Sequence, residues 1–291
     1  MDHVNTIKAL RNAIKPWRLA NESIAFVPTM GNLHEGHLKL VEVAQSKADK
    51  VIVSIFVNPT QFGPGEDYAN YPRTEDEDRK KLQAVGADLL FTPSVSEVYR
   101  PGTSTTVSVT KLAKLYCGAF RPGHFNGVAT IVCKLFNMVQ PDFAIFGQKD
   151  YQQLTIINAM VRDLNMPIEI IGVPTVRTPE GLAMSSRNNY LSPKEKEIAP
   201  MLYVSLSVAR ELISEGNHAY AQIERQALEF LRQEGFQPEY FNVCRASDLQ
   251  KATAEDVDLV ILAAAKLGKT RLIDNIHFNL QSSAIANESM W

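Results

Sequence analysis

Two histidines three residues apart lie in the segment Pro28-Thr29-Met30-Gly31-Asn32-Leu33-His34-Glu35-Gly36-His37. We expect this segment to follow a buried strand and to open a helix. His34 and His37 would then share one face of a helix N-terminus, where the dipole and the free N–H groups attract phosphate oxygens. Gly31 would permit a tight turn, and Gly36 would let a ligand approach the backbone. The structural alternative is that His34 caps the helix and His37 packs on it; a zinc site lacks a third ligand nearby.

Amide side chains follow the next predicted strand, in Asn58-Pro59-Thr60-Gln61-Phe62-Gly63. Asn58 and Gln61 can hydrogen-bond a carboxylate or a hydroxyl group without adding charge. An ordinary proline-containing loop is the alternative interpretation. The loop interpretation explains the segment at least as well by itself, and the position beside the histidine segment strengthens the case for binding.

A lysine occupies a third strand end, in Gly147-Gln148-Lys149-Asp150-Tyr151-Gln152-Gln153. Lys149 can place a positive charge on a phosphate and stabilise charge that moves onto a leaving group. Asp150 suits a capping role at the helix that follows. A solvated surface lysine is the alternative for Lys149.

A fourth candidate is Ala183-Met184-Ser185-Ser186-Arg187-Asn188, in a polar segment. Two hydroxyl groups and a forked guanidinium can clamp phosphates, although Ser-Ser-Arg alone is a common loop string.

The turn Arg121-Pro122-Gly123-His124 precedes another predicted helix, and both of its basic side chains could point into a cleft. The acidic run Glu75–Asp78 is typical of a solvated helix N-terminus, and Asp78 is a weak candidate for a magnesium ligand.

Strand and helix patterns alternate through the part of the chain that carries the first three candidates. Runs rich in β-branched residues predict strands at 23–27, 50–57, 87–92, 142–146 and 168–176, and helical spacing predicts helices at 38–48, 74–85, 127–139 and 151–164. This alternation predicts an α/β fold with a doubly wound, Rossmann-like parallel sheet and helices on both faces. Ligands bind such sheets at the carboxyl ends of the strands.

The pattern changes after Val176. The polar segment 177–189 predicts a mobile connection, followed by helices at 193–216 and 219–235 and strands at 240–245, 257–264 and 271–277. We therefore expect two domains: residues 1–175 as a Rossmann-like domain with the first three candidate motifs, and residues 176–291 as a smaller α+β domain carrying the MSSRN loop. The polar final dozen residues are expected to fray.

Composition narrows the class of protein. The chain has 291 residues, a formal net charge of -2 and three widely spaced cysteines, Cys117, Cys133 and Cys244. These values favour a small-molecule enzyme of the reducing cytoplasm over a nucleic-acid-binding or disulfide-rich protein. We expect no secretory signal and no membrane span. A GxxxxGK[ST] loop and a GxGxxG motif are both absent from the sequence.

The motifs together resemble those of one family. HEGH at 34–37 resembles the HIGH motif of the adenylyl-transferring superfamily that includes class I aminoacyl-tRNA synthetases, and MSSRN at 184–188 resembles its KMSKS counterpart. With PTMGNLHEGH, NPTQF, RPGHF, GQKDYQQ and GLAMSSRNNYLS in order from about Val4 to Ile276, the chain is similar to the pantoate–β-alanine ligase family. Members often carry a glutamate where Cys117 stands, and the tail beyond Ile276 has no role that the resemblance supplies.

The resemblance implies an ATP-dependent ligase that condenses pantoate with β-alanine through a pantoyl-adenylate and releases pantothenate, AMP and pyrophosphate. By matching position it implies an ATP site of Met30, Gly31, Asn32, Leu33, His34, Glu35, Gly36, His37, Gly147, Gln148, Lys149, Asp150, Val176, Met184, Ser185, Ser186 and Arg187. Its catalytic members would be His37 as proton donor, His34 as phosphate-binding partner, and Lys149, Ser185, Ser186 and Arg187. Gln61 and Gln153 would hold pantoate, Gln61 also β-alanine, with Asn58 beside them.

The family further implies Mg²⁺ and a homodimer.

Three other interpretations of the sequence stay open. A related nucleotidyltransferase would retain the nucleotide in its product. A tRNA synthetase would need an added RNA-binding domain, for which neither length nor charge leaves room. A catalytically silent nucleotide-binding regulator would bind ATP without releasing AMP.

Overall fold

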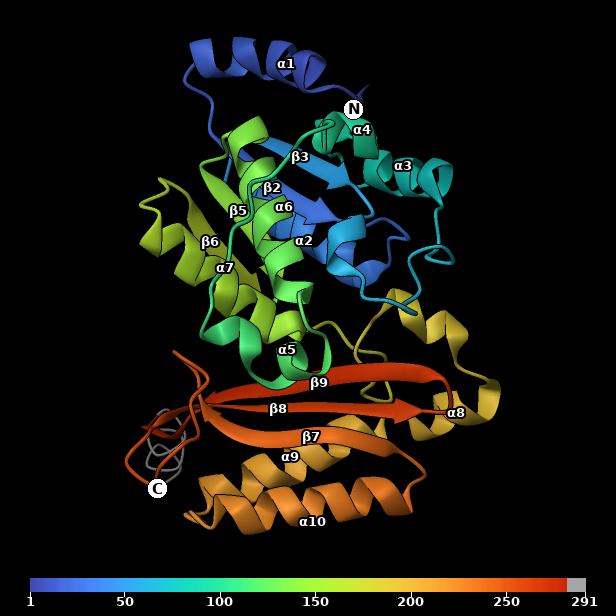
Figure 1. Ribbon diagram of the computed structural model, residues 1–291, viewed down its shortest axis with the longest axis vertical. Helices are drawn as coiled ribbons and strands as arrows, with labels where there is room; N and C mark the ends of the chain where they lie inside the picture. The colour runs from blue at the N-terminus through green and yellow to red at the C-terminus, as the bar shows by residue number, and fades with distance from the viewer. Residues whose placement is uncertain (282–291) are drawn as a thin grey trace, which may run out of the picture. The chain divides into compact units, whose positions relative to one another are not determined.

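The chain forms two compact units, seen in a computed structural model that describes residues 1–281 (Figure 1). The first unit consists of Met1–Gln148 and Gln153–Val176. The second consists of Lys149–Gln152 and the chain from Arg177 onward. The expected fraying of the last dozen residues concerns positions that lie almost entirely outside the described residues. Within residues 1–281, no helix combines the length and apolar character needed to cross a membrane.

The first unit contains a six-stranded parallel sheet, which confirms the predicted doubly wound class. The strand order is β1-β4-β3-β2-β5-β6. The strands are β1 (Asp2–Val4), β2 (Ile24–Thr29), β3 (Lys50–Ile55), β4 (Leu89–Phe91), β5 (Phe143–Gly147) and β6 (Glu169–Val173). The chain moves outward from β2 through β3 to β4, and β5 then adds on the other side of β2. The switch point of the sheet therefore lies between β2 and β5.

Alternating side chains of β2 explain why helices cover both faces of the sheet. Ala25 and Val27 belong to a buried apolar cluster with α2 (Glu35–Gln45) and with Leu82 of α3 (Glu75–Ala84). Phe26 points to the other face, where its ring packs edge-on against Phe136 of α6 (His124–Val139) at a centroid distance of 6.5 Å. A strand buried on both faces must be apolar throughout, as β2 and β3 are.

Several further elements complete the first unit. They are the helices α1 (Ile7–Leu19), α4 (Val95–Val98) and α5 (Tyr116–Phe120), and the 3₁₀ turns η1 (Pro59–Gln61) and η2 (Leu112–Lys114). Two elements divide between the units: of η3 (Gln148–Asp150) only Gln148 belongs to the first unit, and α7 (Tyr151–Asp163) begins in the Lys149–Gln152 segment of the second. The pattern analysis did not predict α1. Pro16 lies inside this helix, and the Oγ1 atom of Thr6 accepts a hydrogen bond from the N–H of Ala9 at its start.

The second unit is a three-stranded antiparallel sheet, β7-β8-β9, with two long helices packed on one face. Its elements are η4 (Ser186–Tyr190), α8 (Pro193–Ile198), α9 (Met201–Ser214), α10 (Tyr220–Gln233), β7 (Gln237–Arg245), β8 (Asp258–Leu267) and β9 (Thr270–Asn279). The core joins alternate β8 residues such as Ile261 and Ala263 to Leu206 of α9 and Leu231 of α10. This confirms the predicted smaller α+β region.

One element prediction was wrong in detail. The region 193–216 was expected to be a single helix, but α8 ends at Ile198 and α9 begins at Met201. Pro200 is the N-cap residue of α9. Because proline has no N–H and its ring clashes with the preceding turn, a continuous helix through this position would be strongly disfavoured.

Candidate active site

The first predicted motif lies beside the switch point of the sheet. β2 ends at Thr29 and β5 ends at Gly147, and these two strands pair in parallel. Their carboxyl ends therefore meet at one edge, where doubly wound sheets bind ligands. Gly147 and Gln148 lie in the first unit together with the histidine motif. The topology brings the ends of β2 and β5 together, and the chemistry expected of their motifs stays a prediction.

The two histidine rings are in contact at the start of α2, with their planes tilted by 36°. His34 is the N-cap residue with extended backbone angles (φ -129°, ψ 175°), and its ring lies 4.1 Å from the ring of His37, centroid to centroid. The backbone N–H of His34 donates to Nδ1 of His37 at 3.3 Å. When its ring is neutral, His37 therefore carries its proton on Nε2, which makes that nitrogen the donor available to a ligand. The capping role and the ligand-binding role are compatible.

The turn before the histidines is fixed by a carboxylate from α3. Gly31 and Asn32 have positive φ angles of 82° and 52°. Asp78 is fully buried, and its oxygens accept hydrogen bonds from the backbone N–H groups of Asn32 (2.8 Å) and Leu33 (2.7 Å). The hydroxyl of Thr74 donates to the same carboxylate at 3.2 Å. These contacts give Asp78 a structural role, whereas its role as a magnesium ligand stays a prediction.

The orientation of the Asn58 side chain follows from two backbone groups. Its Oδ1 atom accepts from the N–H of Thr60 at 3.4 Å, and its Nδ2 atom donates to the carbonyl of Gly127 at 3.2 Å. Since a backbone N–H can only donate and a carbonyl can only accept, the amide cannot be reversed. Nδ2 also donates to Oε1 of Gln61 at 3.1 Å, which leaves Nε2 of Gln61 as its donating end.

A tyrosine outside the predicted site supports this arrangement. The hydroxyl of Tyr99 donates to Oδ1 of Asn58 at 2.8 Å. Burial raises the pKa of Tyr99, so the hydroxyl stays protonated and able to donate. A Cβ atom on Gly127 would collide with the carbonyl group of Thr60, which explains why glycine occupies this point of α6. No spacing in the sequence marks Tyr99, because its partner lies 41 positions away.

Gln61 also joins the second predicted motif to the first. Its Nε2 atom lies 3.1 Å from the sulfur of Met30. Its backbone carbonyl accepts from Nη2 of Arg121 at 3.3 Å and lies 2.7 Å from Nδ1 of His124. Arg121 and His124, expected to point into a cleft, therefore hold the Gln61 segment.

An ion pair anchors this support. Nε and Nη2 of Arg121 donate to the two carboxylate oxygens of Glu66 at 2.7 and 2.5 Å. Burial opposes ionisation of Glu66, but the hydrogen bonds and charge of Arg121 prevail and hold the pKa of the carboxyl below its usual range. The pair is partly buried, with 15% of the arginine and 24% of the glutamate side chain exposed. The guanidinium is therefore fixed when it contacts Gln61.

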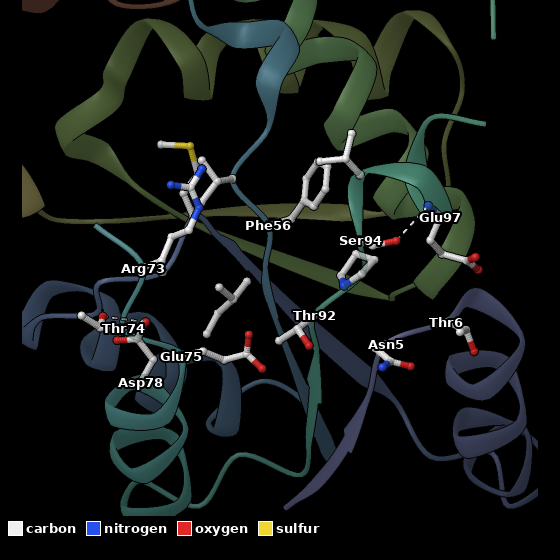
Figure 2. Close-up of a pocket in the computed structure, with 16 residues that line it drawn as sticks. Asn5, Thr6, Phe56, Arg73, Thr74, Glu75, Asp78, Thr92, Ser94 and Glu97 are labelled. Atoms are coloured by element: carbon white, nitrogen blue, oxygen red, sulfur yellow. Dashed lines mark hydrogen bonds between the residues drawn. The ribbon is translucent and has the colours of Figure 1, made fainter. Parts of the chain in front are cut away.

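A pocket of about 460 Å³ lies beside the glycine turn in the first unit (Figure 2). Met30 and Gly31 line it from the turn, Phe56 from the segment after β3, and Thr92 from the segment after β4. Its volume is typical of small-molecule pockets. Of the predicted site residues, it includes Met30, Gly31 and Asp78, so it borders the predicted site without enclosing the histidines.

The third predicted motif divides between the two units. Lys149 groups with the second unit, although its neighbour Gln148 belongs to the first. The carbonyl of Lys149 accepts a hydrogen bond of 2.8 Å from Nδ2 of Asn275, and its Nζ atom lies 3.9 Å from Oδ2 of Asp150. Gln153 and Val176 lie in the first unit. Their predicted ligand contacts stay predictions.

The fourth motif follows a short hairpin in the second unit. Arg177 pairs with Ala183 in an antiparallel bridge. Ser185 then has an extended backbone, and its hydroxyl accepts from the N–H of Arg187 at 3.3 Å, which starts η4. The segment predicted as mobile thus contains a hairpin and a capped 3₁₀ turn. Both Lys149 and the Ser185–Arg187 segment belong to the second unit.

Metal ligands do not gather within residues 1–281: no group of three His, Cys, Asp or Glu side chains there could hold an ion. The three cysteines are free thiols, and Cys117 and Cys244 are buried.

The chain is similar to known proteins over nearly its whole length. The family model described as pantoate-beta-alanine ligase matches residues 2–277. A pantothenate synthetase of Methylococcus capsulatus is 54% identical over 285 residues, covering 97% of this chain and 100% of that protein. A pantothenate synthetase of Pseudomonas fluorescens is 55% identical over 282 residues, covering 96% and 100%.

Solved structures agree with these sequence relatives. The pantothenate synthetase of Thermus thermophilus superimposes with a TM-score of 0.90 at 47% identity and covers 95% of this chain and 99% of its own. A pantoate-beta-alanine ligase of Francisella tularensis, complexed with beta-gamma ATP and beta-alanine, has a TM-score of 0.78 at 35% identity and covers 95% and 97%. The geometry, the family model and these relatives lead to one conclusion: the chain belongs to the pantoate–β-alanine ligase family.

Proposed function

We propose that this ligase condenses pantoate with β-alanine through a pantoyl-adenylate, with release of AMP and pyrophosphate. One observation carries the proposal: Nε2 of Gln61 lies 3.1 Å from Met30, at the turn that leads to the histidine pair. A donor suited to a carboxylate or hydroxyl oxygen therefore lies next to a segment suited to phosphates. Attack of a carboxylate on a phosphate requires these two kinds of group to be neighbours.

In the first step, a pantoate carboxylate oxygen attacks the α-phosphorus of ATP and pyrophosphate leaves. Gln61, Gln153 and Asn58 bind or orient pantoate in this proposal. His34 and His37 bind the phosphates from the start of α2, and the Nε2–H of His37 serves as proton donor. Lys149, Ser185, Ser186 and Arg187 neutralise charge that develops on the leaving pyrophosphate.

In the second step, the neutral amine of β-alanine attacks the carbonyl carbon of the mixed anhydride and AMP leaves. The Francisella tularensis structure is described as complexed with beta-gamma ATP and beta-alanine, which supports ATP and β-alanine as ligands here. Since water would hydrolyse the adenylate, we assign the second unit the role of a lid that limits solvent access. Mg²⁺ would enter with ATP, because it is usually held by substrate phosphates and few carboxylates.

Product analysis tests the proposal. Purified protein is incubated with ATP, Mg²⁺, pantoate and β-alanine, each omitted in turn, and the products are identified by mass spectrometry. Pantothenate and AMP in equal amounts, with no AMP formed without pantoate, would support the ligase. Intact ATP with all substrates present would contradict it and favour a nucleotide-binding regulator.

Sedimentation analysis tests the homodimer that the family implies.

A further inference from the structure

A buried ion pair in the second unit joins the start of the fourth motif to β9. Nη1 and Nη2 of Arg177 donate to the two oxygens of Asp274 at 2.6 and 2.9 Å. Only 3% of the Asp274 side chain and 16% of the Arg177 side chain is exposed. The guanidinium also stacks on the ring of Tyr203, 3.5 Å from its centroid. The two parallel hydrogen bonds and the ring contact therefore fix the orientation of the guanidinium group.

The same arginine holds the hairpin before the phosphate-binding segment. Nη1 of Arg177 donates to the carbonyl of Gly181 at 3.1 Å, and the N–H of Thr178 donates to the carbonyl of Leu182 at 2.8 Å. At the far side of the hairpin, Nδ2 of Asn188 donates to the carbonyl of Ala183 at 3.0 Å. The Ser185–Arg187 segment therefore lies between Ala183, which pairs with Arg177 in the hairpin, and Asn188, which donates back to Ala183.

A second arm of the network reaches the lysine motif. Oδ1 of Asp274 accepts from the backbone N–H of Asn275 at 2.8 Å, and Nδ2 of Asn275 donates to the carbonyl of Lys149 at 2.8 Å. Asn275 is 5% exposed. Lys149 and Asn275 are 126 positions apart in sequence but belong to the same compact unit. The adjacent β9 residues Asp274 and Asn275 therefore contact the lysine segment directly and, through Arg177, the hairpin that precedes Ser185–Arg187.

The energetics favour a positioning role for this network. A buried ion pair contributes little net stability relative to apolar residues of the same size, because both charges lose their hydration. Its hydrogen bonds do, however, fix direction, and apolar packing could not impose the same orientation on two polar loops. The ion pair interrupts the apolar helix-facing row of β9, where Leu272 and Ile276 flank Asp274.

We infer that Arg177, Asp274 and Asn275 are positioning residues of the adenylation step: they hold Lys149 in a fixed position relative to Ser185, Ser186 and Arg187. This inference rests on the proposed function of those four residues as phosphate-binding groups. A displacement of Lys149 would weaken charge stabilisation on the leaving pyrophosphate without changing the chemistry of the amine step.

The test uses Asn275→Ala, which removes the donor to Lys149 and retains the ion pair. The rate of pantoate-dependent exchange of labelled pyrophosphate into ATP should fall about tenfold, the loss expected for one buried hydrogen bond. The KM values for pantoate and β-alanine should change less than about twofold. Introduced into Lys149→Ala, the same substitution should have no further effect, because interacting residues are not additive.

A matched control separates positioning from general destabilisation. Glu239→Gln breaks another partly buried ion pair of the same sheet, in which Oε2 of Glu239 accepts from Nε of Arg271 at 2.9 Å. It should lower the melting temperature and leave the exchange rate of the folded protein unchanged. Asp274→Asn should reduce exchange more than Asn275→Ala; if it does not fold, Asn275→Ala alone decides.

Two outcomes would overturn the inference. One is an unchanged exchange rate in Asn275→Ala. The other is an equal relative decrease in exchange rate when Asn275→Ala is added to Lys149→Ala. Absence of pantoate-dependent exchange in the unsubstituted enzyme is a different result. It would refute the adenylate mechanism itself, and the two failures are thereby distinguished.

Discussion

The carboxylate of Asp78 accepts a 2.7 Å hydrogen bond from the backbone N–H of Leu33, in the turn directly before the paired histidines. α3 thereby fixes a turn that follows β2. Nζ of Lys81, one helical turn further along α3, donates to the carbonyl of Leu33 at 2.7 Å. Both the N–H and the C=O groups of this residue are thus held by a single helix. The geometry of the histidine motif depends on α3 as well as on its own sequence.

Asp78→Asn should destabilise the protein and reduce its activity. The amide would bring an N–H₂ group toward backbone N–H donors, and loss of a buried charge-assisted hydrogen bond costs about 2 kcal/mol of unfolding free energy. We expect pantoate-dependent pyrophosphate exchange to fall at least about tenfold. Asp76→Asn, on the exposed side of the same helix, is the control and should be close to the unsubstituted enzyme.

Magnesium titration separates the two roles considered for Asp78. A structural role predicts that added Mg²⁺ does not restore the activity of Asp78→Asn. Recovery of the rate at high Mg²⁺ would instead assign this carboxylate to the metal.

His37→Ala should slow AMP formation by roughly 10²–10³ with the fold retained, because it removes a donor to developing phosphate charge. His34→Ala should also slow the reaction, since it removes the partner ring whose centroid lies 4.1 Å from that of His37. Initial rates of AMP release and circular dichroism measure both effects. Turnover at the unsubstituted rate in either variant would remove that histidine from the mechanism.

Tyr99→Phe tests the orientation of Gln61. Loss of the hydroxyl that donates to Asn58 should loosen the amide pair and raise the KM for pantoate by about three- to tenfold, the effect of one net hydrogen bond. Tyr220→Phe is a suitable control, because this buried tyrosine lies in the second unit with its hydroxyl 3.2 Å from Nδ1 of His218. Equal KM values for Tyr99→Phe and the unsubstituted enzyme would show that Asn58 needs no such support.

The Glu66–Arg121 ion pair should stabilise the fold in a pH-dependent way. The pKa of Glu66 is lowered in the folded state, so its contribution is fully present above its unfolded-state pKa, about pH 4. The contribution is lost as the pH falls below that value through the lower folded-state pKa. The free energies of unfolding in urea of the unsubstituted enzyme and of Glu66→Gln should therefore differ at neutral pH and converge in acid. A difference in unfolding free energy that stays the same at every pH would contradict a lowered pKa of Glu66.

The sequence was sufficient to predict the parallel sheet, because β2 and β3 are apolar throughout and each precedes a segment with helical spacing. It also located the candidate motifs, since glycine, histidine, amide and lysine groups follow strand ends. Contacts between distant segments were not predictable in this way. The hydrogen bond from Asn275 to Lys149 joins positions 126 residues apart in the sequence. The sequence also did not predict that Lys149–Gln152 belongs to the second unit. The structural role of Asp78 was not predictable either, because an acidic run such as Glu75–Asp78 is typical of any solvated helix N-terminus.

The most direct test of the account follows the carboxylate oxygen. Pantoate labelled with heavy oxygen in its carboxylate is converted with ATP and β-alanine, and the AMP is analysed by mass spectrometry. Attack of this carboxylate on the α-phosphorus predicts one labelled oxygen in each AMP molecule and none in pyrophosphate. Unlabelled AMP, or ADP formed together with labelled phosphate, would contradict the pantoyl-adenylate mechanism.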